Sequence, residues 1–206
     1  MNVVTPMRVL AVFVLSIMMG GFLAAVGLAA DAPLSSKAFF AGGCFWCMEE
    51  AFEAVDGVAS VVSGYTGGRP ANPSYDEVSA GGTGHAEAVE VRYDSSKVSY
   101  QRLLQHFWRN IDPLAVDRQF CDRGNQYRSA IFYHGEEQRR LAEESKAALE
   151  RSGKLKGTIA TQIVAAGPFY PAEEYHQDYY RKNPQRYKFY KWSCGRAQRL
   201  EELWGK

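Results

Sequence analysis

The sequence predicts an α+β fold, a two-layer sandwich in which helices pack on a central mixed sheet, followed by an irregular C-terminal tail. Apolar residues recur at helical spacing in some segments and alternate with a period of two in others. These segments do not follow the regular strand–helix–strand order of a doubly wound protein. The chain has 206 residues, 46% of them hydrophobic and 23% charged, so one globular domain is expected.

The N-terminal 30 residues differ in composition from the rest of the chain. Arg8 is followed by an apolar run up to Ala30, and the first acidic residue is Asp31. This pattern predicts a cleaved signal peptide or, if it is not cleaved, a membrane anchor of ~20 residues. Residues 31–36 are then a linker and residues 37–206 the functional domain. We expect an exported protein, periplasmic or otherwise extracytoplasmic, that contacts the membrane only through this segment.

The first half of the domain is expected to alternate strands and helices, each bounded by glycine, proline or aspartate signals. In order, we expect a strand Ala38–Ala41 closed by two glycines, a helix with Phe45, Met48, Phe52 and Val55 on one face, a strand Val58–Tyr65, a turn-rich loop 66–73, a strictly alternating strand His85–Tyr93, and a helix Tyr100–Trp108.

The second half of the domain is also expected to contain strands and helices bounded by turn signals. We expect a strand Tyr127–Tyr133, a charged amphipathic helix Glu136–Leu149, a strand Ile159–Ala165, a helix Glu173–Arg181 that stops before Pro184, and an aromatic, basic tail Gln185–Lys206 that ends in a short helix-like segment, QRLEELW.

Charge and cysteine spacing exclude several functions. Lys and Arg number 24 against 23 Asp and Glu, a formal net charge of +1, so no overall field attracts nucleic acid and no such partner is expected. Cys44 and Cys47 form a Cys-x-x-Cys pair, typical of a thioredoxin-like dithiol. Cys121, Cys194 and the four histidines stand singly, so the spacing predicts no metal site.

Of the four cysteines, Cys44 has the surroundings that most favour a reactive thiol. It directly follows a glycine pair and lies at the first turn of the first predicted helix. Backbone N–H groups and the positive end of the helix dipole favour a thiolate there, and the glycines let a substrate approach the sulfur. We therefore interpret Cys44 as a nucleophile; a buried, inert cysteine is the alternative.

Glu87 is a candidate acid. Strict alternation places it on the apolar face of its strand, whereas Glu90 falls on the other face with Arg92 and is expected to be a surface carboxylate. A carboxyl without water has a raised pKa, stays protonated near neutral pH, and can donate a proton to a substrate oxygen. The alternative for Glu87 is a structural acid bound to backbone.

Several motifs occur in the order found in one enzyme family. They are GGCFWC, SGYTGG, NPSY, GTGHAEAVEVRYD, HFWRNIDP and RGNQYRSAIFY. From about Lys37 to Pro184 the chain resembles the A-type peptide-methionine sulfoxide reductases (the MsrA family). The resemblance implies an α+β fold, no bound metal or organic cofactor, and reduction of the S-epimer of methionine sulfoxide, free or in proteins.

The resemblance also implies catalytic roles. Cys44 attacks the sulfoxide sulfur, releases methionine and is left as a sulfenic acid. Glu87 polarises the sulfoxide oxygen, and the hydroxyls of Tyr75 and Tyr127 assist it.

Further roles concern substrate binding. By the same resemblance, Phe45 and Trp46 form an apolar pocket for the substrate methyl group. Asp122 holds a polar substrate group or a network of water molecules.

We expect the protein to be a monomer.

The resolving cysteine is left open, because the chain departs from the commonest family pattern. Many members carry glycine in place of Cys47 and a glycine-rich cysteine tail in place of KFYKWSCGR. Cys194 is the favoured candidate, Cys47 the second and Cys121 the third. The resolving thiolate would form a disulfide with Cys44, and thioredoxin or a thioredoxin-like protein would then reduce it.

Two other classes of function fit parts of the sequence. An exported thiol–disulfide oxidoreductase using Cys44 and Cys47 would act on protein disulfides and would not need Glu87. An exported, aromatic-lined binding module would keep its ligand after every thiol is alkylated. Neither class requires a buried acid beside a helix-start thiol.

Overall fold

A computed structural model of the chain describes residues 1–2 and 35–205. The predicted signal peptide or anchor, apart from its first two residues, lies outside the described residues, as does most of the predicted linker. Within the described part of the chain, no helix is both long enough and apolar enough to cross a membrane.

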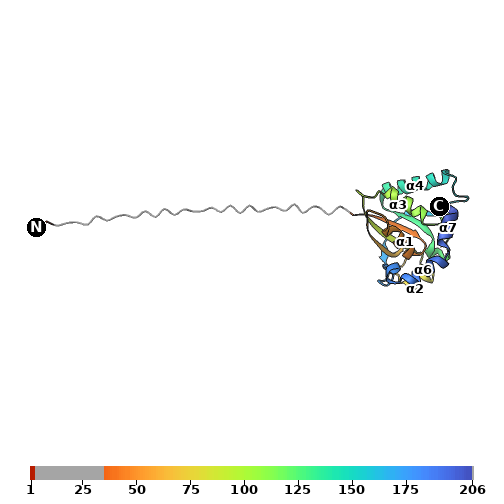
Figure 1. The fold of residues 1–206 in the computed structure, drawn as a ribbon, viewed down its shortest axis with the longest axis horizontal. Helices are drawn as coiled ribbons and strands as arrows, with labels where there is room; N and C mark the ends of the chain where they lie inside the picture. The colour runs from red at the N-terminus through yellow and green to blue at the C-terminus, as the bar shows by residue number, and fades with distance from the viewer. Residues whose placement is uncertain (3–34, 206) are drawn as a thin grey trace. The chain divides into compact units, whose positions relative to one another are not determined.

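Within residues 35–205, helices pack against a central sheet (Figure 1). The sheet is mixed and six-stranded, with the strand order β7-β6-β1-β3-β2-β8. Neighbouring strands are antiparallel except β6 and β7, which are parallel. A separate ladder pairs β4 (Arg118–Gln119) with β5 (Asp122–Arg123). The strands of the main sheet are β1 (Ser35–Gly42), β2 (Val58–Thr66), β3 (Ala86–Asp94), β6 (Ser129–Tyr133), β7 (Gln162–Ala165) and β8 (Phe169–Pro171).

The helices that build the second layer are α1 (Phe45–Glu53), α3 (Tyr100–Arg109) and α4 (Gly135–Arg151). Their apolar faces share one buried core with the sheet. Phe40 of β1 stacks on Phe52 of α1 and on Phe107 of α3, with ring centroids 4.8 and 5.1 Å apart. The predicted two-layer α+β fold is confirmed.

The turn between β1 and α1 decides where the helix begins. Gly43 has a φ of +83°, a conformation that side chains rarely adopt, and a Cβ atom there would collide with the buried side chain of Gln119. The chain therefore turns tightly, and Cys44 becomes the residue before the first helical residue of α1. The predicted strand, turn and helix are confirmed here.

Strand β3 confirms the alternation but not the predicted exposure of Glu90. Glu87 is 3% exposed, on the face that packs against the helices. Glu90 pairs with Arg92 at 2.7 Å, yet it is only 7% exposed. Its exposure was wrongly predicted because Lys37 of the neighbouring strand β1 also pairs with it, at 3.2 Å, and covers it.

The segment before the tail differs from the predicted helix Glu173–Arg181. Asp178 has a φ of 52°, which interrupts the helix, so the regular part is only α5 (Tyr179–Lys182). Pro184 starts a new helix, α6 (Pro184–Ser193), at the position where its missing N–H costs nothing.

The tail itself, predicted to be irregular, is largely helical. Gly195 separates α6 from α7 (Arg196–Trp204), and α7 contains the predicted QRLEELW segment. Tyr187 of α6 is buried in one cluster with Cys44 and Cys47, which explains why the tail is ordered. Aromatic side chains of the tail and of α5 thus pack with the two cysteines in a small buried cluster of their own.

The remaining differences are local. A short helix α2 (Tyr75–Ser79) was not predicted, although Ser74 and Glu77 form a capping box at its start. The predicted strand Tyr127–Tyr133 begins instead with a 3-10 turn, Asn125–Tyr127, and becomes a strand at Ser129.

Candidate active site

The seven predicted site residues lie around one cavity of about 210 Å³. Tyr190 of α6 joins them and was not predicted. A larger hollow, of about 430 Å³ between α3 and α4, contains none of these residues. The lining residues of the smaller cavity are Cys44, Phe45, Trp46, Tyr75, Glu87, Asp122, Tyr127 and Tyr190. The chemistry of its lining, rather than its size, identifies the site.

Cys44 and Cys47 are free thiols, 6% and 3% exposed, and lie in one buried cluster. Burial raises the pKa of Cys44 well above its usual value, whereas interaction with the Cys44 side chain lowers the pKa of Cys47. The helix start is expected to favour a Cys44 thiolate, and burial of this thiol acts in the opposite direction.

Glu87 is held beside the start of α1. The backbone N–H of Phe45 donates to its Oε2 atom at 3.0 Å. Burial raises the pKa of Glu87 to about 8; the Phe45 hydrogen bond opposes this, and the nearby charge of Asp122 adds to it. Glu87 is therefore protonated at neutral pH, as the alternation of its strand predicts.

Tyr75 and Tyr127 supply neutral hydroxyl groups. Burial raises the pKa of Tyr75 to about 12 and raises the pKa of Tyr127 as well. Tyr75 is fixed by its backbone N–H, which donates to Glu173 at 2.8 Å. Both phenols therefore remain hydrogen-bond donors throughout the neutral range.

Phe45 and Trp46 form the apolar wall of the cavity. The Trp46 side chain is fixed by residues that were not predicted from the sequence. Trp46 stacks on Tyr179 with ring centroids 3.7 Å apart, and its indole N–H donates to Nδ1 of His176 at 3.1 Å. Because the indole nitrogen only donates, Nδ1 of His176 is unprotonated. Burial lowers the pKa of His176, which keeps the ring neutral in this role. The only sequence signal for these two supports was the aromatic segment EEYHQDYY.

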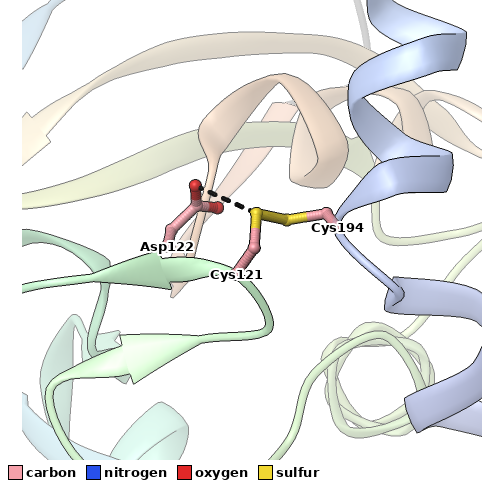
Figure 2. Close-up of side chains that lie close together, drawn as sticks. All are labelled: Cys121, Asp122 and Cys194. Carbon is pink, nitrogen blue, oxygen red and sulfur yellow. Dashed lines mark hydrogen bonds between the residues drawn. A yellow bond between two sulfur atoms is a disulfide. The ribbon is translucent and has the colours of Figure 1, made fainter.

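Asp122 lies where the β4–β5 ladder meets the C-terminal helices. Its neighbour Cys121 forms a disulfide with Cys194, the residue after α6, with Cα atoms 4.9 Å apart (Figure 2). Two of the three candidate resolving cysteines are thus joined to each other. Tyr190 donates to Oδ2 of Asp122 at 2.5 Å, and burial raises the pKa of Asp122.

Among the described residues, one group of side chains is close enough to share a metal ion. Cys121, Asp122 and Cys194 have ligand atoms within 4.8 Å of one another. The two sulfurs are bonded to each other, so they are not thiolate ligands in this state.

Comparisons with known proteins agree with the motifs. A family model described as peptide methionine sulfoxide reductase matches residues 36–206. The peptide methionine sulfoxide reductase MsrA of Bacillus licheniformis is 53% identical over 169 residues, which cover 82% of this chain and 93% of the relative. The MsrA of Bacillus subtilis is 51% identical over 168 residues, 82% of this chain and 95% of the relative.

Solved structures show the same fold. Mxr1 from Saccharomyces cerevisiae in its reduced form has a TM-score of 0.69 and 33% identity, and the match covers 73% of this chain and 87% of that one. Methionine sulfoxide reductase A of Corynebacterium diphtheriae has a TM-score of 0.67 and 35% identity, covering 78% of this chain and 81% of that one.

The fold and the cavity define a cysteine-dependent oxidoreductase on an α+β sheet, with a buried dithiol close to a protonated carboxyl. The chain belongs to the peptide methionine sulfoxide reductase family, and it is an enzyme that reduces methionine sulfoxide.

Proposed function

We propose that Cys44 is the nucleophile and Glu87 the acid in the reduction of methionine S-sulfoxide to methionine. One observation carries this assignment: a buried carboxyl that keeps its proton at neutral pH lines the same small cavity as the dithiol. A sulfoxide oxygen leaves sulfur readily only when it is protonated or hydrogen-bonded, so a thiolate and a neutral acid are needed together.

The first step uses groups already in place. Cys44 passes its proton to Cys47, which lies in the same buried cluster, and the Cys44 thiolate attacks the sulfoxide sulfur to form a bond between the two sulfurs. Glu87 gives its proton to the sulfoxide oxygen, and Tyr75 and Tyr127 donate hydrogen bonds to it. The hydroxyl group then moves from the substrate sulfur to the Cys44 sulfur while the bond between the two sulfurs breaks, so methionine leaves and Cys44 is left as a sulfenic acid.

The apolar wall and the acid select the substrate. Phe45 and Trp46 receive the methyl group, and Asp122 binds a polar group of the substrate or an intervening water. A sulfoxide sulfur is chiral, so a fixed methyl pocket and a fixed acid accept the oxygen of one epimer only.

Resolution of the sulfenic acid falls to Cys47. Its side chain lies in the same buried cluster as Cys44, whereas Cys194 is bonded to Cys121. Cys47, which holds the proton taken from Cys44, attacks the sulfenic sulfur; its proton joins the leaving hydroxyl, so a disulfide forms and water is released. A thioredoxin-like dithiol then reduces this disulfide. Saccharomyces cerevisiae Mxr1 has been solved in complex with Trx2, which supports a reductant of this class.

We also propose that the enzyme is exported. The apolar run before Asp31 is the basis for placing the enzyme outside the cytoplasm, where it would repair oxidised methionine in exported proteins. The reductant is then a thioredoxin-like protein of that compartment, because glutathione and thioredoxin systems of the cytosol do not reach it.

A single-turnover experiment tests the assignment. Reduced enzyme is mixed with one equivalent of methionine S-sulfoxide without a recycling reductant, and methionine is measured. Cys44→Ser is expected to form none, whereas Cys47→Ser completes one turnover and stops at the sulfenic acid. The R-epimer is the substrate control and stays unreduced. Methionine formed by Cys44→Ser would overturn the assignment and favour a reaction at another thiol.

A further inference from the structure

Tyr190 enters the catalytic cavity from the C-terminal helix α6. Its ring meets the indole of Trp46 edge-on, with centroids 5.8 Å apart. Tyr190 lies 146 positions after Cys44 in the chain, and the fold brings the two together in one cluster. The roles described above leave Tyr190 without a function.

The hydroxyl of Tyr190 lies between two functional side chains. It is 2.5 Å from Oδ2 of Asp122, and Tyr190 lines the same cavity and packs in the same cluster as Cys44. Burial, Cys47 and Glu87 all raise the pKa of Cys44, and interaction with the Tyr190 side chain lowers it. The Cys44 thiolate therefore forms in surroundings that oppose it, and Tyr190 is the group that favours it.

We propose that Tyr190 is a catalytic residue, whose hydroxyl turns from Asp122 to the Cys44 sulfur and stabilises the thiolate that attacks the sulfoxide. This proposal rests on the assignment of Cys44 as the nucleophile. The hydroxyl has one hydrogen, so it serves either the carboxylate or the thiolate at a given moment. Once the Cys44 proton has moved to Cys47, the Cys44 sulfur is charged, and a hydrogen bond from Tyr190 to it is worth more than one to the resting, neutral thiol.

The Cys121–Cys194 disulfide keeps this hydroxyl in place. It joins the residue before Asp122 to the residue that follows α6, four positions after Tyr190 (Figure 2). The covalent tie and the Tyr190–Asp122 hydrogen bond therefore connect the same two segments. A phenol that alternates between two hydrogen-bond partners needs a backbone that is held in place, because a displacement of about 1 Å costs much of the reaction rate.

Tyr190→Phe tests the proposal by removing one oxygen atom. Its matched control is Tyr180→Phe, because the Tyr180 hydroxyl also bonds to a carboxylate, Glu53 at 2.6 Å, but does not line the cavity. The first measurement is the rate of iodoacetamide labelling of Cys44 against pH, followed by peptide mass mapping. The second is the rate of the first step in a single turnover with methionine S-sulfoxide.

Tyr190→Phe is expected to shift the Cys44 labelling profile upward by about one pH unit and to slow the first step about tenfold. Tyr180→Phe should leave both unchanged. Labelling and turnover that match the wild type in Tyr190→Phe would overturn the proposal. The labelling profile does not depend on the sulfoxide, so it still decides whether Tyr190 stabilises the Cys44 thiolate if Cys44→Ser shows that another residue is the nucleophile.

A folding defect would be recognised by a lower thermal midpoint than that of Tyr180→Phe. In that case 3-fluorotyrosine is placed at position 190, which keeps the ring and hydroxyl but makes the phenol a better donor. The Cys44 labelling profile should then shift downward; an unchanged or upward shift would refute the hydrogen bond.

Discussion

The backbone N–H of Phe45 lies 3.0 Å from Oε2 of Glu87 and donates a hydrogen bond to it. The contact joins the first residue of α1 to β3, one residue after the thiol of Cys44. Acid and thiol are therefore held by a strand, a turn and a helix packed on the same sheet, which gives the fixed geometry that proton transfer in a reaction requires.

Glu87→Gln is predicted to slow the first step about a hundredfold while the fold is kept, because the amide still accepts from Phe45 but has no proton to transfer. Rapid-mixing measurement of methionine formation in a single turnover checks this. Glu90→Gln is the matched control: it changes a buried carboxyl of the same strand that faces Lys37 and Arg92 instead of the cavity. Equal rates for the two variants would remove Glu87 from the mechanism.

The first step is predicted to lose rate as the pH rises through about 8. Glu87 must be protonated to act, and its pKa is raised to about 8, so the active fraction is high below that pH and falls above it. The pH profile of the single-turnover rate shows this limb directly. In Glu87→Gln the decline near pH 8 should be absent; a variant that retained it would assign the limb to a different group.

Gly43→Ala is predicted to destabilise the enzyme by about 3 kcal/mol, because a Cβ atom there has an unfavourable φ and collides with Gln119. Gln119 has little freedom to move, since its amide exchanges two hydrogen bonds of 2.8 Å with the Asp112 backbone. Urea unfolding measures the loss. Gly153→Ala isolates the collision, since Gly153 has a φ of +63° but open space around it, and should cost about 1 kcal/mol. Similar losses in both variants would mean that backbone strain alone matters.

Glu49 is predicted to make stability depend on pH. It is 1% exposed on α1, and burial raises its pKa to about 7. Between the unfolded value near 4.5 and about 7, the folded state binds the extra proton, so the free energy of unfolding falls with rising pH, by up to about 1.4 kcal/mol per unit, and levels off above 7.

In Glu49→Gln, the free energy of unfolding should fall less between pH 4.5 and 7, because only the contribution of Glu87 is left. Urea unfolding at pH 5, 6, 7 and 8 gives the comparison. If wild type and Glu49→Gln lose stability with the same slope between pH 5 and 7, Glu49 is not protonated in the folded enzyme.

The local part of the site could be predicted from the sequence. Gly43, Cys44 and Phe45 form a turn and a helix start whose geometry depends on neighbouring residues, and the face of Glu87 follows from the period of its strand. These features needed no knowledge of distant contacts. The exposure of Glu90 did need it, because Lys37 approaches from a different strand.

The C-terminal part could not be predicted, because its contacts are long-range. Nothing near Tyr190 in the sequence shows that it lies beside Asp122, and nothing in the spacing pairs Cys121 with Cys194. The surroundings of Cys44 are predictable only in part for a related reason: the helix start is visible in the sequence, but the burial of the thiol, which raises its pKa, depends on the contact with α6.

In the proposed mechanism, Cys44 takes the oxygen of the sulfoxide and Cys47 resolves the sulfenic acid. Mass mapping of the enzyme, with Cys44 and Cys47 reduced, after one equivalent of methionine S-sulfoxide tests both roles at once. We expect a new Cys44–Cys47 disulfide and, in Cys47→Ser, a Cys44 sulfenic acid that dimedone labels. A Cys44 that remains a free thiol while methionine is formed would refute this mechanism.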